Sequence, residues 1–255
     1  MKMKYLFSRT NVRVLESLSL SEALYAFDFD GTLAPIVSAP DRARMSEETE
    51  SLFTRLSAAV PTAVISGRSL ADLKRRIPTG PKYLVGNHGL EGVPGISSVS
   101  ELKNICHAWK CILNPWLDSV RQMGIVLEDK GLSLALHYRA TTSKKLARKR
   151  ILDALQSVNH GAKIIPGKLV FNIIPSFGPH KGVALGSLIG HSRAKFGFFV
   201  GDDHTDEDVF TTKDRRFVTV RVGMKKDSLA AYYLRRQSQI NQLLRHLLRL
   251  HGSVR

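Results

Sequence analysis

Short apolar runs alternate with helical patterns through the first and last thirds of the chain. In residues 23–30 the aromatic Phe27 and Phe29 alternate with Asp28 and Asp30 at the end of an apolar run, and this pattern predicts a strand. Similar runs predict strands over residues 62–66, 82–86, 195–201 and 216–223, and helical spacing predicts helices over residues 46–59, 69–77, 181–190 and 240–252. This alternation favours an α/β fold with a doubly wound parallel sheet.

The middle third of the chain has a different pattern. Residues 100–120 indicate a helix with a bend or break at Pro115, and residues 124–139 contain two alternating runs around a turn, which predicts a β-hairpin. A basic helix over residues 141–157 and two strands over residues 162–165 and 168–174, joined by Pro166–Gly167, follow. Helices on one face of an antiparallel sheet are typical of a small α+β domain.

We therefore expect two domains, joined by glycine-containing linkers at residues 92–95 and 176–178. One is a core domain of residues 1–93 and 177–255. An α+β cap domain of residues 94–176 is inserted into it.

Polar side chains follow the ends of the predicted core strands. The first strand ends at Asp28–Asp30, the second at Ser66–Gly67, the third at residues 86–88 and the fourth at residues 201–203, while Lys181 begins a helix. Parallel sheets bind ligands beyond the carboxyl ends of their strands. These groups are therefore predicted to meet at one edge of the sheet.

Acidic side chains dominate this predicted edge. Asp28, Asp30 and Asp202, with Asp203 and Asp206 close by in the sequence, would repel one another without a cation, and their oxygen atoms suit Mg²⁺. An EF-hand calcium loop is excluded, because it needs a glycine at its sixth position and a glutamate at its twelfth. The chain has leucine and alanine there when counted from the first aspartate, and glutamate and lysine when counted from the third.

The remaining groups at this edge suit an anion. The Ser66 hydroxyl, the Lys181 ammonium, helix N-termini and glycine-rich backbone can bind a phosphoryl group. Attack by a carboxylate, neutralisation of charge and an acid for the leaving oxygen together provide a route for hydrolysis of a phosphate monoester.

Six motifs carry a resemblance to a known family. They are YAFDFDGTLAPI, VISGRSLADLKRRI, LVGNHGLEG, LEDKGLSLALHYR, GPHKGVAL and FVGDDHTDEDVF, and they extend over nearly the whole chain. With them the chain resembles the haloacid-dehalogenase-type phosphatases and, among these, the trehalose-6-phosphate phosphatase family. The resemblance implies a Mg²⁺-dependent enzyme that releases phosphate from trehalose 6-phosphate in the last step of trehalose synthesis.

The resemblance also implies a role for each catalytic residue. Asp28 would attack phosphorus and form an aspartyl-phosphate, and Asp30 would act as acid and then as base. Ser66 and Lys181 would hold the phosphoryl oxygens, with further contacts from Gly31, Thr32 and Arg68. The metal would be bound by Asp28, the Asp30 carbonyl and Asp202, with Asp203 and Asp206 orienting the ligands.

In this family the cap recognises the sugar. The resemblance therefore assigns substrate contacts to Lys130, His137, Arg139 and Asn172 of the cap, and to His88 and Glu91 of the core. A solvated polar face of an antiparallel sheet is the alternative for the hairpin residues. The chain departs from many relatives at Asn172 and Ile174, where those relatives have glutamate and arginine, so the identity of the sugar is open.

Charge is the one unusual feature of the composition. The 255 residues include 38 Lys and Arg against 22 Asp and Glu, which gives a formal charge of +16 and favours anionic partners. We expect a small sugar phosphate and no nucleic acid, because aromatic residues are not interleaved with the cations. The sequence has no run that could span a membrane and no apolar leader, so a cytoplasmic location is expected. We also expect a monomer.

Two other functions remain open on the sequence alone. One is a phosphatase for another glycosyl phosphate, such as mannosyl- or glucosyl-3-phosphoglycerate. The other is a basic anion-binding module without catalysis, against which the presence of Asp28, Asp30, Lys181 and Asp202 argues, because a binding protein does not need the acid/base residue.

Overall fold

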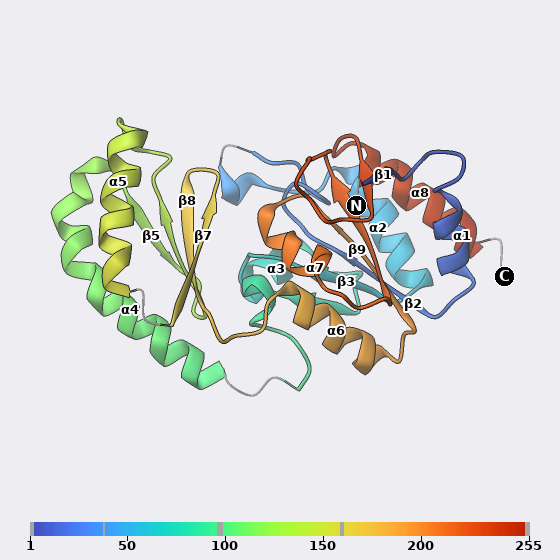
Figure 1. Cartoon of the computed structure of the whole chain (residues 1–255), viewed down its shortest axis with the longest axis horizontal. Coiled ribbons are helices and arrows are strands. Elements are labelled where there is room, and N and C mark those ends of the chain that lie inside the picture. The colour runs from blue at the N-terminus through green and yellow to red at the C-terminus, as the bar shows by residue number, and fades with distance from the viewer. Residues whose placement is uncertain (1–2, 38, 96–98, 159–160, 253–255) are drawn as a thin grey trace. The chain divides into compact units, whose positions relative to one another are not determined.

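The chain forms two compact units (Figure 1). The computed structural model describes residues 3–37, 39–95, 99–158 and 161–252. One unit, here the core unit, is Met1–Pro94 with Pro179–Arg255, and the other, the cap unit, is Gly95–Gly178. The chain therefore leaves the core once and returns once. The assignment of separate functions to these units stays a prediction.

A seven-stranded sheet organises the core unit. Its strands are β1 (Lys4–Tyr5), β2 (Ala23–Phe27), β3 (Thr62–Ile65), β4 (Tyr83–Val85), β9 (Phe196–Gly201), β10 (Phe217–Val222) and β11 (Tyr232–Leu234). They lie in the order β1-β11-β10-β9-β2-β3-β4, and every neighbouring pair is parallel. The central strand β2 is buried along its whole length, as expected for a sheet covered on both faces.

Helices cover both faces of this sheet. They are α1 (Arg13–Ser19), α2 (Glu47–Ala59), α3 (Leu70–Arg76), α6 (Lys181–Ser192), α7 (Glu207–Phe210) and α8 (Gln239–Gly252). On one face the Phe27 ring packs edge-on against Phe53 of α2, and α8 lies beside α2. On the other face the Phe199 ring contacts Phe210 of α7. The predicted doubly wound α/β fold is confirmed.

Local signals place the starts of two helices. The Ser46 hydroxyl accepts a hydrogen bond from Thr49 N at the start of α2, and the Ser69 hydroxyl accepts one from Asp72 N at the start of α3. Each satisfies a backbone donor that has no partner inside the helix. Because α3 directly follows β3, its cap fixes the backbone between Ser66 and Ser69.

The cap unit is an α+β sandwich of two layers. Its elements are α4 (Val99–Val120), β5 (Val126–Asp129), β6 (Leu134–His137), α5 (Lys144–Leu155), β7 (Ala162–Gly167) and β8 (Val170–Pro175). The antiparallel sheet has the order β5-β6-β8-β7, and α4 and α5 lie along one of its faces (Figure 1). Trp109, Leu136, Ile151 and Phe171 are buried between the layers. The predicted β-hairpin and basic helix are present.

The structure corrects two local predictions for the cap. The helix α4 is present and continues through Pro115 without a break, because Trp109 and Leu113 anchor it in the cap core and tertiary packing outweighs the missing hydrogen bond of proline. The turn predicted at Pro166–Gly167 lies at Lys168–Leu169 instead, since Gly167 still pairs with Val170. Proline is tolerated in β7, which is an edge strand.

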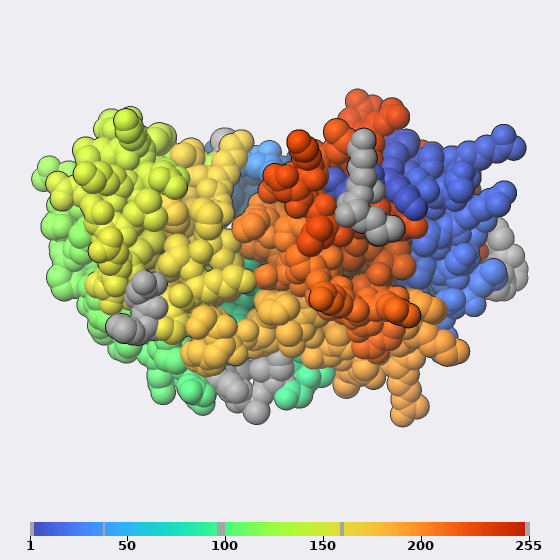
Figure 2. Space-filling model, viewed as in Figure 1, coloured from blue at the N-terminus to red at the C-terminus, as the bar shows by residue number. Residues whose placement is uncertain are grey.

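Part of the positive charge gathers on α5. Lys144, Lys145, Arg148, Lys149 and Arg150 are exposed there, and the outer side of this helix lies on the face of the molecule shown in Figure 2. Within the described part of the chain, none of the helices has the length and the apolar character that crossing a bilayer requires.

The burial of α8 leads to a test of core packing. Leu244 on α8 is fully buried, whereas Leu20 is 83% exposed. We expect Leu244→Ala to lower the free energy of unfolding by about 2–5 kcal/mol, and Leu20→Ala to change it by no more than about 0.5 kcal/mol. Urea denaturation followed by circular dichroism measures both. Equal effects of the two substitutions would contradict the packing of α8 on the sheet.

Candidate active site

A lysine joins two aspartates from distant parts of the chain. Asp28 follows the end of β2, Lys181 begins α6 and Asp206 ends the short helix η5 (His204–Asp206). Lys181 Nζ donates hydrogen bonds to Asp28 Oδ1 at 2.9 Å and to Asp206 Oδ1 at 2.7 Å. Residues 153 positions apart in sequence are thereby held in direct contact.

Burial and neighbouring charges together shift the pKa values of Lys181, Asp28 and Asp202. Burial lowers the pKa of Lys181, but the carboxylates of Asp206 and Asp28 outweigh it and raise the pKa above the usual lysine range. Burial raises the pKa of Asp28, and Lys181 opposes the rise. Burial and the nearby carboxylates of Asp28, Asp206 and Asp203 raise the pKa of Asp202. The lysine therefore stays charged, and the carboxylates need further positive charge in order to ionise together.

In the turn after β2, Gly31 lies directly against the Asp202 carboxylate. Gly31 has a φ of +81°, which glycine adopts at no steric cost, and Gly31 N donates to Ala34 O at 2.7 Å. A Cβ atom at Gly31 would lie 2.1 Å from Asp202 Oδ2. The absence of a side chain here leaves space for the Asp202 carboxylate.

Three carboxylates form a group that fits a metal ion. Asp28, Asp202 and Asp206 each offer one oxygen, and these atoms lie within 4.8 Å of one another. Asp202 Oδ1 is buried and has no hydrogen-bond partner among the described residues. A buried carboxylate oxygen without a partner is costly, and hard divalent cations prefer oxygen ligands. The site therefore fits a divalent cation.

Asp203 and Asp206 fix the turn that follows β9. Asp206 Oδ2 accepts from Asp203 N at 2.9 Å, and the Asp203 carboxylate accepts from Asp206 N. This reciprocal capping box leaves Asp206 bound on both oxygens, to Lys181 and to Asp203 N. Of the predicted metal residues, Asp203 and Asp206 thus order the loop that carries Asp202.

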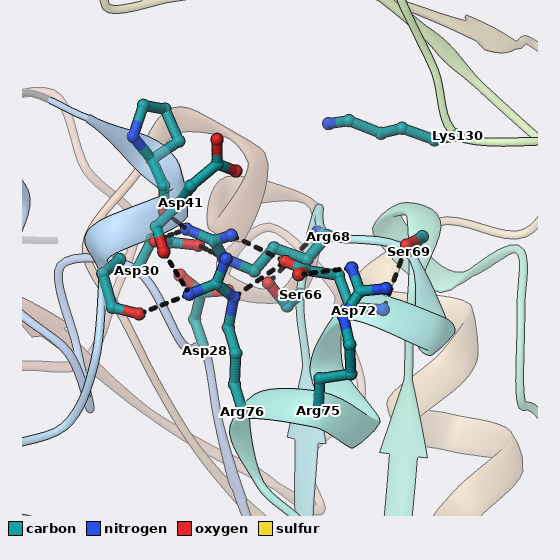
Figure 3. A network of polar contacts seen from close by, with 12 residues as sticks. Asp28, Asp30, Asp41, Ser66, Arg68, Ser69, Asp72, Arg75, Arg76 and Lys130 are labelled. Atoms are coloured by element: carbon teal, nitrogen blue, oxygen red, sulfur yellow. Dashed lines mark hydrogen bonds and ion pairs between the residues drawn. The ribbon is translucent and has the colours of Figure 1, made fainter.

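Arg68 binds the carboxylate of Asp30 through two parallel hydrogen bonds (Figure 3). Arg68 Nε and Nη2 each lie 2.6 Å from an Asp30 oxygen. Arg68 Nη2 also donates to Pro40 O at 2.9 Å, and Nη1 donates to Asp72 Oδ2 at 2.7 Å. The planar guanidinium is therefore held by Asp72 and Pro40 and in turn orients the Asp30 side chain. The predicted contact of Arg68 with substrate stays a prediction.

Asp72 anchors Arg68, and the sequence analysis did not single it out as a site residue. It accepts hydrogen bonds from Arg68, Arg75 and Arg76. Burial opposes ionisation of Asp72, but the bonds from Arg76, Arg68 and Arg75 hold its pKa well below the usual range. The signal in the sequence is the spacing, because arginines lie four positions before and four positions after this aspartate.

Two hydroxyl groups lie at this edge of the sheet. The Ser66 side chain is buried after β3, and its Oγ accepts from Arg68 N at 3.3 Å. Thr32 is fully buried, and its Oγ1 has no hydrogen-bond partner within the described residues. These hydroxyls are available as donors to a bound group.

His88 and Glu91 lie in the loop after β4. His88 is buried with a φ of 61°. Glu91 Oε2 accepts from Leu70 N at 2.8 Å and from Asn87 Nδ2 at 2.9 Å, so its negative charge stabilises the N-terminus of α3. The substrate contacts predicted for both residues stay predictions.

Two of the predicted cap residues lie beside Glu128, which was not predicted. His137 Nε2 lies 2.8 Å and Lys130 Nζ 3.9 Å from Glu128 Oε2. Arg139 Nη2 donates to Lys168 O at 3.2 Å. The alternation of the hairpin could have identified Glu128, since it pairs with Ala135 two positions before His137.

His137 and Asn172 share one face of the cap sheet. Their strand neighbours Leu136 and Phe171 belong to the cap core, and successive side chains in a strand point to opposite faces. His137 and Asn172 therefore lie on the face turned away from α4 and α5. The two residues come from neighbouring strands, β6 and β8.

Together the doubly wound sheet and its carboxyl edge define a class of protein. An aspartate pair after the central strand, a lysine at a helix start and further aspartates after β9 are the arrangement of the haloacid-dehalogenase-type phosphatase fold. A model of the trehalose-phosphatase family matches residues 26–238. The chain belongs to the trehalose-phosphatase family.

Individual relatives share about 30% of their aligned residues with this chain. The trehalose-phosphate phosphatase of Mycobacterium tuberculosis is 29% identical over an alignment of 212 residues, which covers 77% of this chain and 54% of that protein. An uncharacterized glycosyl hydrolase of the same species is 30% identical over 72% of this chain, which spans 15% of that protein. The chain thus spans about half or less of these curated relatives.

A solved structure has the same fold over nearly the whole chain. The C-terminal domain of Candida albicans trehalose-6-phosphate phosphatase matches 99% of this chain and 100% of its own with a TM-score of 0.78. Its sequence identity is 23%, so this likeness supports the fold.

Gly31 provides a test of the close approach to Asp202. We expect Gly31→Ala to weaken Mg²⁺ binding by about tenfold or more, because the new methyl group displaces the Asp202 carboxylate, and the positive φ adds about 1–2 kcal/mol of strain. Gly223→Ala is the matched control, since Gly223 has a φ of +82° and open space around it. Calorimetric titration with Mg²⁺ measures both variants. Equal Mg²⁺ affinity in the two would contradict the steric argument.

Proposed function

We propose that this protein is a Mg²⁺-dependent phosphatase that hydrolyses trehalose 6-phosphate to trehalose and phosphate. The observation that carries the proposal is the contact of Lys181 with Asp28 and Asp206 beside the unpartnered Asp202 oxygen. Membership of the trehalose-phosphatase family supports the substrate.

In the first half of the proposed reaction, an Asp28 oxygen attacks phosphorus. The bond between phosphorus and the sugar oxygen breaks, and that oxygen takes a proton from Asp30. Lys181, held by Asp206, stabilises the negative charge of the phosphoryl oxygens. Thr32 and Ser66 donate hydrogen bonds to the same group. The product is an aspartyl-phosphate on Asp28 and free sugar.

In the second half, water attacks the phosphorus of the aspartyl-phosphate. Asp30 takes the proton of this water, the acyl–phosphate bond breaks, and Asp28 is released as a carboxylate. Arg68 orients Asp30 for both transfers through its two hydrogen bonds. Asp30 thus ends the cycle protonated, as it began.

Asp28, Asp202 and the Asp30 carbonyl would hold the metal ion. When bound, Mg²⁺ supplies positive charge that lets the carboxylates ionise together and polarises the phosphoryl group. Asp203 and Asp206 keep the turn after β9 in place through their capping box.

We propose that Lys130, His137, Arg139 and Asn172 of the cap bind the sugar, with His88 and Glu91 contributing from the core. Charged and amide groups of this kind hydrogen-bond sugar hydroxyls. Asn172 is uncharged and the neighbouring Ile174 is buried and apolar, so this chain offers fewer charged contacts than many relatives. A mannosyl- or glucosyl-3-phosphoglycerate is therefore the second candidate substrate.

A panel of phosphate esters tests the function. We expect phosphate release from trehalose 6-phosphate in the presence of Mg²⁺ and its loss in excess EDTA. Asp28→Asn should lower kcat by about 10⁴-fold or more, because it removes the nucleophile, while the far-ultraviolet circular dichroism stays unchanged. The panel also includes mannosyl- and glucosyl-3-phosphoglycerate.

The outcomes separate the candidates. Turnover of a phosphoglycerate ester without turnover of trehalose 6-phosphate would replace the substrate and keep the mechanism. Absence of hydrolysis together with salt-sensitive binding of nucleic acid would favour the non-catalytic anion-binding module.

The cap variants Lys130→Ala and His137→Ala test sugar recognition. We expect each to lower kcat/KM for trehalose 6-phosphate by about 10- to 100-fold, since a hydrogen bond to a charged group is worth about 1.5–3 kcal/mol. Hydrolysis of 4-nitrophenyl phosphate should change less than about twofold, because it has no disaccharide. Lys149→Ala on the exposed side of α5 is the control. Parallel losses on both esters would show that these residues do not contact the sugar.

A further inference from the structure

A buried arginine lies one strand away from the proposed metal site. Arg221 is at the carboxyl end of β10, where it pairs in register with Gly201 of β9, directly before Asp202. Only 7% of its surface is exposed, and its neighbours Val220 and Val222 are buried. A buried guanidinium is costly unless it is paired and hydrogen-bonded, so its partners indicate what it does.

The Arg221 guanidinium binds the backbone of the turn that carries Asp202. Its Nη2 donates to Asp202 O, and its Nη1 donates to Asp203 O at 3.1 Å. Two consecutive carbonyl groups are thus held by the two ends of one planar group. An ammonium group lacks this fixed fork, so lysine cannot reproduce both bonds in the same geometry.

Glu207 holds Arg221 in this position. Arg221 Nη1 lies 3.1 Å from Glu207 Oε1, and the second oxygen of Glu207 accepts from Leu229 N at 3.1 Å. Both side chains are largely buried. The carboxylate therefore neutralises the arginine and ties it to the loop before β11.

The side chain of Asp202 depends on this backbone. Asp202 Oδ1 has no hydrogen-bond partner in the described part of the chain, so the direction of the carboxylate follows from the position of the turn. The capping box of Asp203 and Asp206 fixes the far end of the turn. Arg221 fixes its beginning.

We propose that Arg221, with Glu207 as its counter-charge, is a positioning residue that sets the affinity of the site for a divalent cation by holding the turn of Asp202. The proposal rests on the metal dependence of the proposed function. The direction of the change in Mg²⁺ affinity distinguishes this role from a simple effect of charge. Removing a nearby positive charge strengthens the binding of a cation, whereas loosening the turn weakens it.

Mg²⁺ binding to the whole protein without any phosphate ester provides the test. Isothermal titration calorimetry and the Mg²⁺-induced rise in Tm are measured for the unmodified protein, Arg221→Gln and Arg221→Lys. We expect Arg221→Gln to weaken Mg²⁺ binding by about 10- to 100-fold, the range found for residues that orient metal ligands. Arg221→Lys should lose less, because it keeps the charge and one hydrogen bond.

Arg216→Gln is the matched control. Arg216 precedes β10, pairs with Asp214 and is half exposed, and its substitution removes the same charge roughly 16 Å along the strand from Arg221. Its Mg²⁺ affinity should stay within about twofold of the unmodified protein, as for other surface substitutions away from a site. Steady-state kinetics adds a second readout: kcat of Arg221→Gln should recover at saturating Mg²⁺ with KM for the ester unchanged.

Several results would overturn the proposal. They are Mg²⁺ affinity in Arg221→Gln that is equal to or higher than in the unmodified protein, a loss of kcat that saturating Mg²⁺ does not restore, or absence of Mg²⁺ binding in the unmodified protein. If Arg221→Gln does not fold, Arg221→Lys and Glu207→Gln decide by the same titration. The protein could also bind Mg²⁺ in a way that depends on Arg221 and yet hydrolyse no phosphate ester. That result would reject the proposed function and leave this inference standing.

Discussion

A single buried ammonium group organises the chemistry of this protein. Lys181 contacts Asp28 and Asp206, and the Asp202 carboxylate lies within 4.8 Å of both. When these three carboxylates are ionised, one lysine leaves two negative charges without a counter-charge in the group. The low dielectric of the interior makes that excess costly. A divalent cation would balance it and allow these acidic side chains to lie together.

Most strands of the core sheet could be anticipated from the sequence, and the two short strands at one edge could not. The strand β2 is buried throughout and β9 at every residue after Phe196, and their apolar runs are strong signals. The strands β1 and β11 have two and three residues, which is too short for any periodicity. They form by pairing, β11 with the edge of β10 and β1 with β11. Neither strand can therefore be predicted from the sequence.

Some residues of the candidate site could likewise be located from the sequence, and others could not. Asp28, Ser66, Lys181 and Asp202 follow strand ends or begin a helix, and the rule for parallel sheets locates such residues without coordinates. Arg221 could be noticed as a cation in an apolar strand. Its bonds to two carbonyl groups could not, because backbone acceptors leave no mark in the sequence. The contact of Arg68 with Asp30 depends likewise on the path of the loop around Pro40.

The arrangement around Asp30 constrains the proposed proton transfers. Arg68 donates to both oxygens of Asp30, so a proton on Asp30 must occupy a lone pair that Arg68 leaves free on one of these oxygens. Arg68 keeps its other bonds, to Asp72 Oδ2 and Pro40 O, and Asp72 is itself held by Arg76. The guanidinium would therefore stay in place while Asp30 gains and loses a proton in the proposed reaction. An arginine anchored on its far side can orient an acid/base group through both steps, because it does not depend on that group for its own position.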